Sequence, residues 1–135
     1  LKQLKEEGVH TELVNLVIPS RNDSPDEIRS MCRWIKSELG ADVPLHFSRF
    51  YPMYRLKSLP PTPVATLEAA WKTALEEGLH YVYIGNVPGH PAENTFCPAC
   101  KKTVVERKGY QVQKVSLQGG KCEFCRHPIR GIWEI

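Results

Sequence analysis

The sequence predicts an α/β fold in which three successive αβ units precede a small zinc-ribbon-like β tail. The first part rests on a repeat: three times in the first 87 residues a helical pattern ends at a glycine and a strand-like run follows. The tail rests on two C-x-x-C pairs separated by 21 residues. Strands joined by helices must pair in parallel. We therefore expect a parallel sheet within residues 1–93 and a metal-binding tail over residues 94–135.

The composition limits the class of protein. The chain has 135 residues, of which 41% are hydrophobic, enough to build a core. The sequence contains no apolar run of membrane-spanning length, and its first residues lack the apolar stretch of a signal peptide. Five cysteines, an odd number, fit free thiols and a metal better than disulfides. We expect a soluble protein of the reducing cytoplasm.

The first αβ unit begins inside a helix. Residues 1–7 have the pattern of final helical turns, and Gly8 can adopt the left-handed conformation that ends them. A nearly continuous apolar run within residues 9–18 then predicts a strand that is buried on both faces.

The second unit has the clearest helix start in the sequence. Ser24 is the expected N-cap, Pro25 the first helical residue, and Glu27 the partner that completes a capping box. The helix ends at Gly40, and residues 45–51 form the next strand. Cys32 belongs to the apolar stripe of this helix, so we interpret it as a buried hydrophobic residue rather than a ligand or nucleophile.

The third unit follows a proline-rich turn. Thr62 is the expected N-cap of a helix that starts at Pro63 and ends at Gly78, and residues 81–87 form the third strand.

Polar residues stand at the carboxyl end of each predicted strand. In parallel sheets, binding sites lie at the carboxyl ends of the strands, so Arg49 and Asn86 are candidates for lining a pocket. We interpret residues 20–23 mainly as a turn and helix cap, and His46, inside the second strand, as a core histidine with one hydrogen bond.

The tail has the order of a zinc ribbon. Each C-x-x-C pair can supply two thiolates, and Cys97, Cys100, Cys122 and Cys125 together make a tetrahedral structural zinc site. Strands are expected over residues 103–107, 110–115 and 129–135, with a turn at residues 108–109. The same ligands would also suit iron, as a rubredoxin-like site or an auxiliary Fe–S cluster.

Two histidines lie near the cysteines. A fifth ligand is disfavoured once four thiolates are present, so His90 is expected to make hydrogen bonds or face substrate. His127 would be a weak substitute ligand only if one cysteine were unused.

The tail is also basic, with 8 basic and 3 acidic side chains over residues 97–135. This balance indicates a nucleic-acid partner only modestly, because four thiolates on a divalent ion offset part of it. Tyr110, Phe124 and Trp133 could stack on bases, but we expect them mainly to pack over the metal.

Five ordered blocks carry a resemblance that covers essentially all 135 residues. They are LVIPSRND at residues 16–23, HFSRFYP at 46–52, PPTPV at 60–64, YVYIGNVPGH at 81–90 and NTFCPAC at 94–100. Together they resemble the carboxyl-terminal part of the AmmeMemoRadiSam-system radical SAM enzymes, relatives of pyruvate formate-lyase activating enzymes. The resemblance implies the last strands of a partial (β/α) barrel with a zinc-ribbon-like tail.

The family resemblance also implies a reaction. Such enzymes hold a 4Fe-4S cluster on a C-x-x-x-C-x-x-C loop, cleave S-adenosylmethionine reductively, and use the 5′-deoxyadenosyl radical to abstract a hydrogen atom. No two cysteines in this sequence have the C-x-x-x-C spacing. The chain is therefore expected to be the carboxyl-terminal portion of a longer enzyme, inactive alone, with the amino-terminal part as its partner.

The same resemblance implies positions for the ligands. Those expected to help seat the adenosyl group lie at the carboxyl ends of the first two strands: Val17, Ile18, Pro19, Ser48, Arg49 and Tyr51. Tyr51 stands where the family often has histidine; a tyrosine can stack or donate a hydrogen bond. The candidates for touching a substrate, which is a protein or a small molecule, are Asn86, His90, Glu93 and Asn94. The alternative function is a zinc-ribbon module that contacts nucleic acid or a protein partner; no membrane association is expected.

Overall fold

The computed structural model describes residues 1–133 and divides the chain into two units, Leu1–Val87 and Pro88–Ile135. The first unit contains one sheet and the second unit two, and each unit has its own buried residues. No helix among the described residues is long and apolar enough to cross a membrane.

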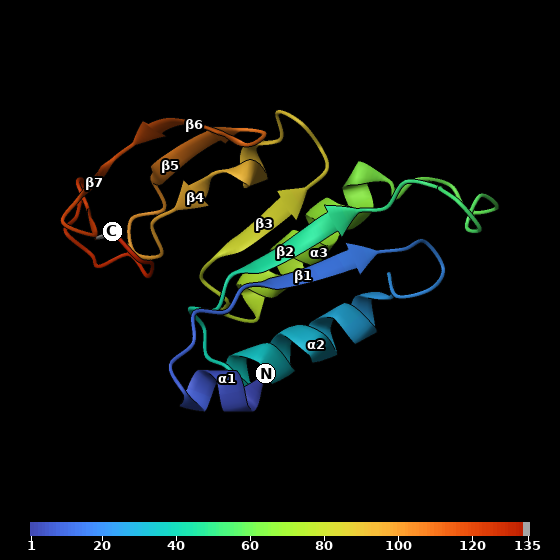
Figure 1. Ribbon diagram of the computed structural model, residues 1–135, viewed down its shortest axis with the longest axis horizontal. Helices are drawn as coiled ribbons and strands as arrows, with labels where there is room; N and C mark the ends of the chain where they lie inside the picture. Colours follow the sequence, from blue (N-terminus) through green and yellow to red (C-terminus); the bar gives the residue numbers. More distant parts are fainter. Residues whose placement is uncertain (134–135) are drawn as a thin grey trace. The chain divides into compact units, whose positions relative to one another are not determined.

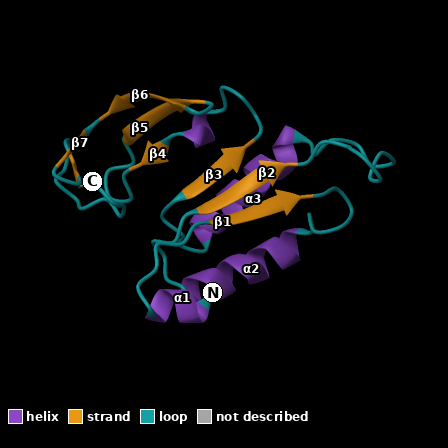
Figure 2. Ribbon diagram, in the orientation of Figure 1, coloured by secondary structure: helices purple, strands orange, loops and turns teal. Residues whose placement is uncertain are grey.

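The first unit alternates helices and strands, as the αβ repeat predicts (Figures 1 and 2). Its elements are α1 (Lys2–Glu6), β1 (Leu13–Val17), α2 (Pro25–Glu38), β2 (Leu45–Arg49), α3 (Val64–Glu76) and β3 (Val82–Gly85). The three strands pair in parallel in the order β1-β2-β3, with Val14 opposite His46 and His46 opposite Tyr83. The predicted parallel sheet is confirmed.

The helix ends agree with the sequence better than the helix starts do. Gly40 and Gly78 follow α2 and α3 with φ of 103° and 93°, the left-handed region that glycine adopts without a steric penalty. Ser24 is the N-cap of α2, but its side chain makes no capping hydrogen bond, so the predicted capping box does not form. The N-cap of α3 is Pro63 rather than Thr62, whose side chain is used elsewhere.

One face of the sheet is covered by α2 and α3 and forms the core. Because side chains alternate along a strand, every second residue points to the helices. The sheet residues buried there are Val17, Leu45, Phe47, Val82 and Ile84. They meet Ile28, Cys32 and Ile35 of α2 and Leu67, Ala70 and Ala74 of α3, which are also buried. Full burial of one such large side chain contributes roughly 1.5–3 kcal/mol.

Among the described residues, the opposite face of the sheet is exposed along β1. Val14 and Leu16 of β1 alternate with the core residues, and they are 71% and 44% exposed. The prediction that this strand is buried on both faces is therefore wrong for the described chain. Next to them, His46 stacks on Tyr83 with ring centroids 4.7 Å apart, and its Nε2 lies 2.9 Å from Glu12 Oε2. His46 thus lies on this face of the sheet, and the prediction that it is a core histidine is wrong.

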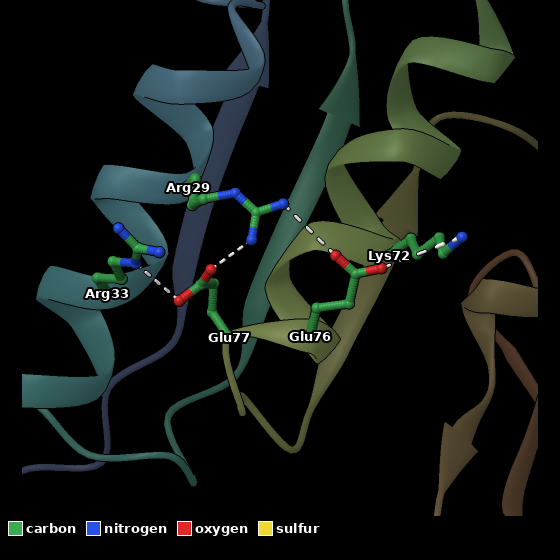
Figure 3. Close-up of polar contacts among 5 residues, drawn as sticks. All are labelled: Arg29, Arg33, Lys72, Glu76 and Glu77. Atoms are coloured by element: carbon green, nitrogen blue, oxygen red, sulfur yellow. Dashed lines mark hydrogen bonds and ion pairs between the residues drawn. The ribbon is translucent and has the colours of Figure 1, made fainter.

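Charged side chains join α2 to α3 on the outside of the helix layer (Figure 3). Arg29 pairs with Glu77 and, at 3.4 Å, with Glu76; Arg33 Nε donates to Glu77 Oε2 at 2.9 Å. Hydrogen bonds from Arg33 and Arg29 lower the pKa of Glu77. These contacts link the two helices at the surface.

The second unit is built mainly of short antiparallel strands. After the 3₁₀ turn η1 (Pro91–Glu93), β4 (Thr95–Phe96), β5 (Thr103–Lys108) and β6 (Gln111–Val115) form one sheet. A second hairpin pairs β7 (Leu117–Gln118) with β8 (Lys121–Cys122). The predicted hairpin between the cysteine pairs is confirmed, and Gly109 forms its turn with φ of 58°.

The predicted closing strand over residues 129–135 does not form in its described part. Residues 129–133 contain no strand, and a single bridge joins Lys121 to Pro128. The indole Nε1 of Trp133 donates to the carbonyl of Ile129 at 2.8 Å, so the chain folds back on itself there. The last two positions of this prediction lie outside the described residues.

Candidate metal centre and sheet-edge site

The two C-x-x-C segments adopt the same backbone turn. In the first, the N–H of Cys97 donates to the carbonyl of Lys102, and the N–H of Lys101 donates to the carbonyl of Cys97, both at 2.9 Å. In the second, the N–H of Cys122 donates to the carbonyl of His127, and the N–H of Arg126 donates to the carbonyl of Cys122, again at 2.9 Å. The residue after each pair is left-handed, with φ of 63° at Lys101 and 65° at Arg126. The two segments are thus matching knuckles.

The knuckles bring four thiol groups together. Their sulfur atoms all lie within 4.8 Å of one another, with 3.6 Å between Cys97 and Cys125 and 3.7 Å between Cys100 and Cys122. A tetrahedral ion with metal–sulfur bonds of about 2.3 Å places its ligands about 3.8 Å apart. The cluster therefore fits one metal ion, as the spacing of the cysteines predicts. Among the described residues, this is the one group with such a ligand set.

The electrostatics of the four thiols favour a cation. Burial raises the pKa of Cys122, but the N–H groups of Cys125 and Phe124 and the neighbouring thiols lower it to about 7. At Cys125 the N–H of His127 lowers the pKa, whereas burial and the other thiols raise it to about 12. Negative charge on one sulfur thus opposes ionisation of another, and a bound cation would relieve that opposition.

Of the three aromatic residues expected to pack over the metal, Tyr110 does not do so. Tyr110, at the turn between β5 and β6, is fully exposed and does not cover the cysteines. Phe124 is 45% exposed, and the Nζ of Lys102 lies 4.6 Å from the centre of its ring. Trp133 is 44% exposed.

The carboxyl ends of β2 and β3 bring four of the predicted residues together in the first unit. Asn86 Nδ2 donates to Ser48 Oγ at 3.0 Å and to the carbonyl of Arg49 at 3.2 Å. Tyr51 Oη donates to the carbonyl of Asn86 at 3.2 Å and accepts from Arg49 Nη1 at 3.0 Å. We call Ser48, Arg49, Tyr51 and Asn86 the sheet-edge cluster. Its backbone is specialised, because Asn86 is left-handed with φ of 60°.

Thr62 fastens this cluster to the strand ends. Its side chain is completely buried; Oγ1 donates to the carbonyl of Val17 at 2.6 Å and accepts from the N–H of Phe50 at 3.0 Å. Its own carbonyl accepts from Arg49 Nε at 2.8 Å. One residue therefore ties the end of β1, the end of β2 and the start of α3 together.

The end of β1 is occupied mostly by a self-contained turn. Asn22 accepts from the N–H of Ile18 at 2.7 Å and donates to the carbonyl of Leu16 at 2.9 Å. Asp23 Oδ1 accepts from the N–H of Ser20 at 2.9 Å. The side chain of Val17 is buried in the core, while Ile18 and Pro19 are half-buried. The interpretation of residues 20–23 as a turn agrees with these contacts.

The other substrate-side candidates lie in the second unit, where they make local bonds. His90 Nδ1 accepts from the N–H of Ala92 at 3.1 Å and caps η1. Glu93 Oε2 accepts from the N–H groups of Gly89 and Gly109 at 3.2 and 3.3 Å. Asn94 Oδ1 accepts from the N–H of Arg107 at 2.7 Å. Glu93 and Asn94 thus link η1 to the β5–β6 hairpin.

Comparison with known proteins gives one informative match. No protein-family profile and no solved structure matches the chain. The chain is 45% identical over 130 residues to an uncharacterized protein of Methanocaldococcus jannaschii. That alignment covers 95% of this chain and 39% of the archaeal protein, so the chain spans about two fifths of the length of this relative.

Thr62 is the important residue whose predicted role, the N-cap of α3, is wrong. A signal for it does exist. Thr62 stands between Pro61 and Pro63, and proline has no backbone N–H, so Thr62 carries the hydrogen-bond donors of this segment. The buried partners of its hydroxyl come from residues 12 and 45 positions away, and no local pattern indicates them.

Proposed function

We propose that this chain is the carboxyl-terminal portion of a radical SAM enzyme and that it supplies part of the S-adenosylmethionine site. The sheet-edge cluster carries the proposal. Its four polar residues stand at the carboxyl ends of parallel strands, where α/β proteins bind ligands, and they are joined by hydrogen bonds. The hydroxyl of Ser48 as a donor and the amide oxygen of Asn86 as an acceptor fit a polar group such as an adenosyl moiety.

The arrangement of the first unit supports the more specific proposal that its sheet is part of a (β/α) barrel. Consecutive strands are neighbours, helices cover one face, and apolar residues of β1 stand exposed on the other. In a barrel that second face is the filled interior. β1 is also an edge strand with an unpaired side. In the longer protein, a preceding strand would pair with the free edge of β1, and the barrel interior would cover its exposed face.

The cysteines of this chain do not fit the radical-generating cluster. Four of them form the matching knuckles, and Cys32 is fully buried within α2, where burial raises its thiol pKa to about 11. When bound, the 4Fe-4S cluster and S-adenosylmethionine supply the 5′-deoxyadenosyl radical. We assign the cluster ligands to the rest of the protein, and to this chain the binding and orientation of the ligand.

The knuckle site is proposed to hold zinc in a structural role. Four thiolates leave no open position for a substrate or water, which is the arrangement of closed structural sites. The second unit also has few large buried residues besides its cysteines, so a metal cross-link would contribute much of its stability. Metal analysis with an absorption spectrum separates colourless zinc from iron, whose visible thiolate bands would contradict this assignment.

Binding of S-adenosylmethionine to the complete protein tests the proposed site. In Asn86→Gly, the left-handed backbone is kept while the amide that holds Ser48 is lost. We expect affinity to fall about 30-fold, since the cluster loses two hydrogen bonds of about 1 kcal/mol each and 1.4 kcal/mol corresponds to a factor of ten.

Ser20→Gly is the matched control, because Ser20 is also left-handed, with φ of 61°, but lies in the separate turn after β1. Its affinity should stay within about twofold of the wild type. A wild-type protein that does not bind S-adenosylmethionine, or an Asn86→Gly variant that binds it equally well, would contradict the proposal.

One observation favours a second candidate function, a nucleic-acid-binding ribbon. The fully exposed ring of Tyr110 stands at a hairpin turn next to Lys108 and Gly109, and exposed aromatic rings among basic residues can stack on bases. Binding of single-stranded oligonucleotides at low ionic strength, lost in Tyr110→Ala, would support it. No binding at low salt removes it, since the attraction to phosphate is strongest there.

A further inference from the structure

Arg49 has no acidic partner among residues 1–133. The ion pairs of the first unit use other basic side chains, including Lys2, Arg29, Arg33 and Lys72. Arg49 instead contacts a backbone carbonyl and a phenol, both of them neutral. A half-buried guanidinium without a counter-ion retains its full positive charge for a ligand.

The guanidinium is nevertheless held firmly. Nε donates to the carbonyl of Thr62 at 2.8 Å, Nη1 donates to Tyr51 Oη at 3.0 Å, and Cζ lies 4.9 Å from the centre of the Tyr51 ring. Both supports are themselves fixed. Tyr51 donates to the carbonyl of Asn86, and Thr62 is buried and bonded to β1 and β2. Little side-chain entropy remains to be lost when a ligand binds.

Donors remain after these contacts. Arginine carries five N–H groups in a planar fork, and the two contacts to Thr62 and Tyr51 leave three for a ligand. Thr62 is also two residues before α3 begins at Val64, so the guanidinium lies next to the positive end of a helix dipole. Both features favour an anion, and the planar fork suits a carboxylate.

We propose that Arg49 is an anchoring residue that binds a carboxylate of the ligand at the sheet-edge cluster. This inference rests on the proposed function for the identity of the ligand, but the anion site itself does not. The carboxylate has two possible sources: the methionyl part of S-adenosylmethionine or the substrate. Tyr51 and Thr62 are positioning residues that hold the fork in place.

The experiment combines two readouts on the complete protein. Calorimetry compares S-adenosylmethionine with 5′-methylthioadenosine, which lacks the carboxylate. Nuclear magnetic resonance follows the Nε–H signal of Arg49 during titration with malonate. The variants are Arg49→Gln, Arg49→Lys and the control Arg55→Gln; Arg55 also lies over a tyrosine, Tyr54 at 5.3 Å, but in an exposed loop.

Two results support the inference and separate the sources. If Arg49→Gln weakens S-adenosylmethionine at least tenfold but leaves 5′-methylthioadenosine unchanged, the methionyl carboxylate is the ligand group. If S-adenosylmethionine is unaffected but malonate shifts the Arg49 signal, the carboxylate belongs to the substrate. In either case Arg49→Lys should rescue only part of the binding, because lysine lacks the fork, and Arg55→Gln should behave as the wild type.

Other results overturn one proposal without the other. Unchanged affinity for S-adenosylmethionine in Arg49→Gln, together with no malonate response, refutes the carboxylate site and leaves the proposed function standing. A malonate response in a wild-type protein that does not bind S-adenosylmethionine refutes the proposed function and leaves the anion site standing.

Discussion

A single buried hydroxyl, that of Thr62, holds together the part of the molecule where we place the ligand. It bonds to the carbonyl that ends β1 and to the N–H that follows β2, while the backbone of the same residue holds Arg49. The positions of Arg49 and Tyr51 therefore depend on a residue that is inaccessible to any ligand.

Thr62→Val should destabilise the protein by about 1–3 kcal/mol, because the substitution keeps the shape of the side chain and leaves two buried polar groups without their partner. Chemical denaturation measures the loss. Thr11→Val is the control, since its hydroxyl bonds to Val9 at an exposed site; a change below about 0.5 kcal/mol is expected there. Equal effects of the two substitutions would show that Thr62 has no special role.

Cys97→Ser or Cys122→Ser should abolish stoichiometric metal binding and unfold the second unit, because both thiols belong to the same four-ligand site. Metal content after gel filtration and thermal unfolding check this. Cys32→Ala, in the core of the first unit, should keep the metal. Retention of metal by both knuckle variants would refute the shared site.

At the residue scale, the sequence predicted which side chains lie together better than it predicted long-range hydrogen-bond partners. The spacing of the cysteines indicated a shared site because each pair closes within one turn. Arg49 and Asn86 were found because polar residues that follow buried strands stand out. The role of Thr62 depends on strands that are distant in sequence, and a helix start nearby offered a plausible but wrong use for its hydroxyl.

At the scale of elements, ion pairs between side chains link α2 to α3 outside the core. Glu77 receives hydrogen bonds from both Arg29 and Arg33, and it stands at the carboxyl end of α3, where the helix dipole disfavours a negative charge. The two arginines outweigh that effect, since the pKa of Glu77 is lowered.

This lowered pKa predicts a pH dependence. A carboxyl group with a lower pKa in the folded state contributes stability above its unfolded value of 4.5 and loses it as pH falls through the folded pKa. Glu77→Gln should therefore lower the melting temperature at pH 7, and the difference from wild type should shrink below pH 4.5. The same substitution at Glu106 of β5 is the control. A difference that persists unchanged to pH 2 would contradict an ionic origin.

The elements themselves were largely predictable, because glycines, prolines and apolar runs mark their ends. The closing strand was not predictable in this way. Its apolar residues suggested a strand. Instead, after the second knuckle, the N–H of Ile129 donates to the carbonyl of Gly120, and the indole of Trp133 donates to the carbonyl of Ile129. The knuckle fixes the direction of this segment, and that constraint does not show in residue periodicity.

At the scale of the whole molecule, the uncovered face of the first sheet is the main feature to be explained. A partial barrel would bury Val14 and Leu16, which are exposed in the described chain. The burial of β1 on both faces, which its apolar run predicts, would then be a property of the longer protein. A partial barrel would therefore explain both the apolar run of β1 and the exposure of Val14 and Leu16 in the described residues.

Leu16→Ser in the complete protein tests this. Burial predicts a loss of at least about 2 kcal/mol, the cost of removing a large apolar side chain from a core. Val112→Ser, at an exposed position of β6, should change stability by less than about 0.5 kcal/mol. A comparably small effect at Leu16 would show that this face is solvated and would contradict the partial-barrel proposal.

The central claim is that this chain belongs to a radical SAM enzyme, and formation of 5′-deoxyadenosine tests it most directly. The complete protein would be prepared without oxygen, its iron–sulfur cluster reconstituted, and S-adenosylmethionine added with a strong reductant. We predict 5′-deoxyadenosine that depends on both the reductant and the protein, with less formed by Asn86→Gly than by Ser20→Gly. A protein that assembles no iron–sulfur cluster, or one that forms no 5′-deoxyadenosine under these conditions, would contradict the claim.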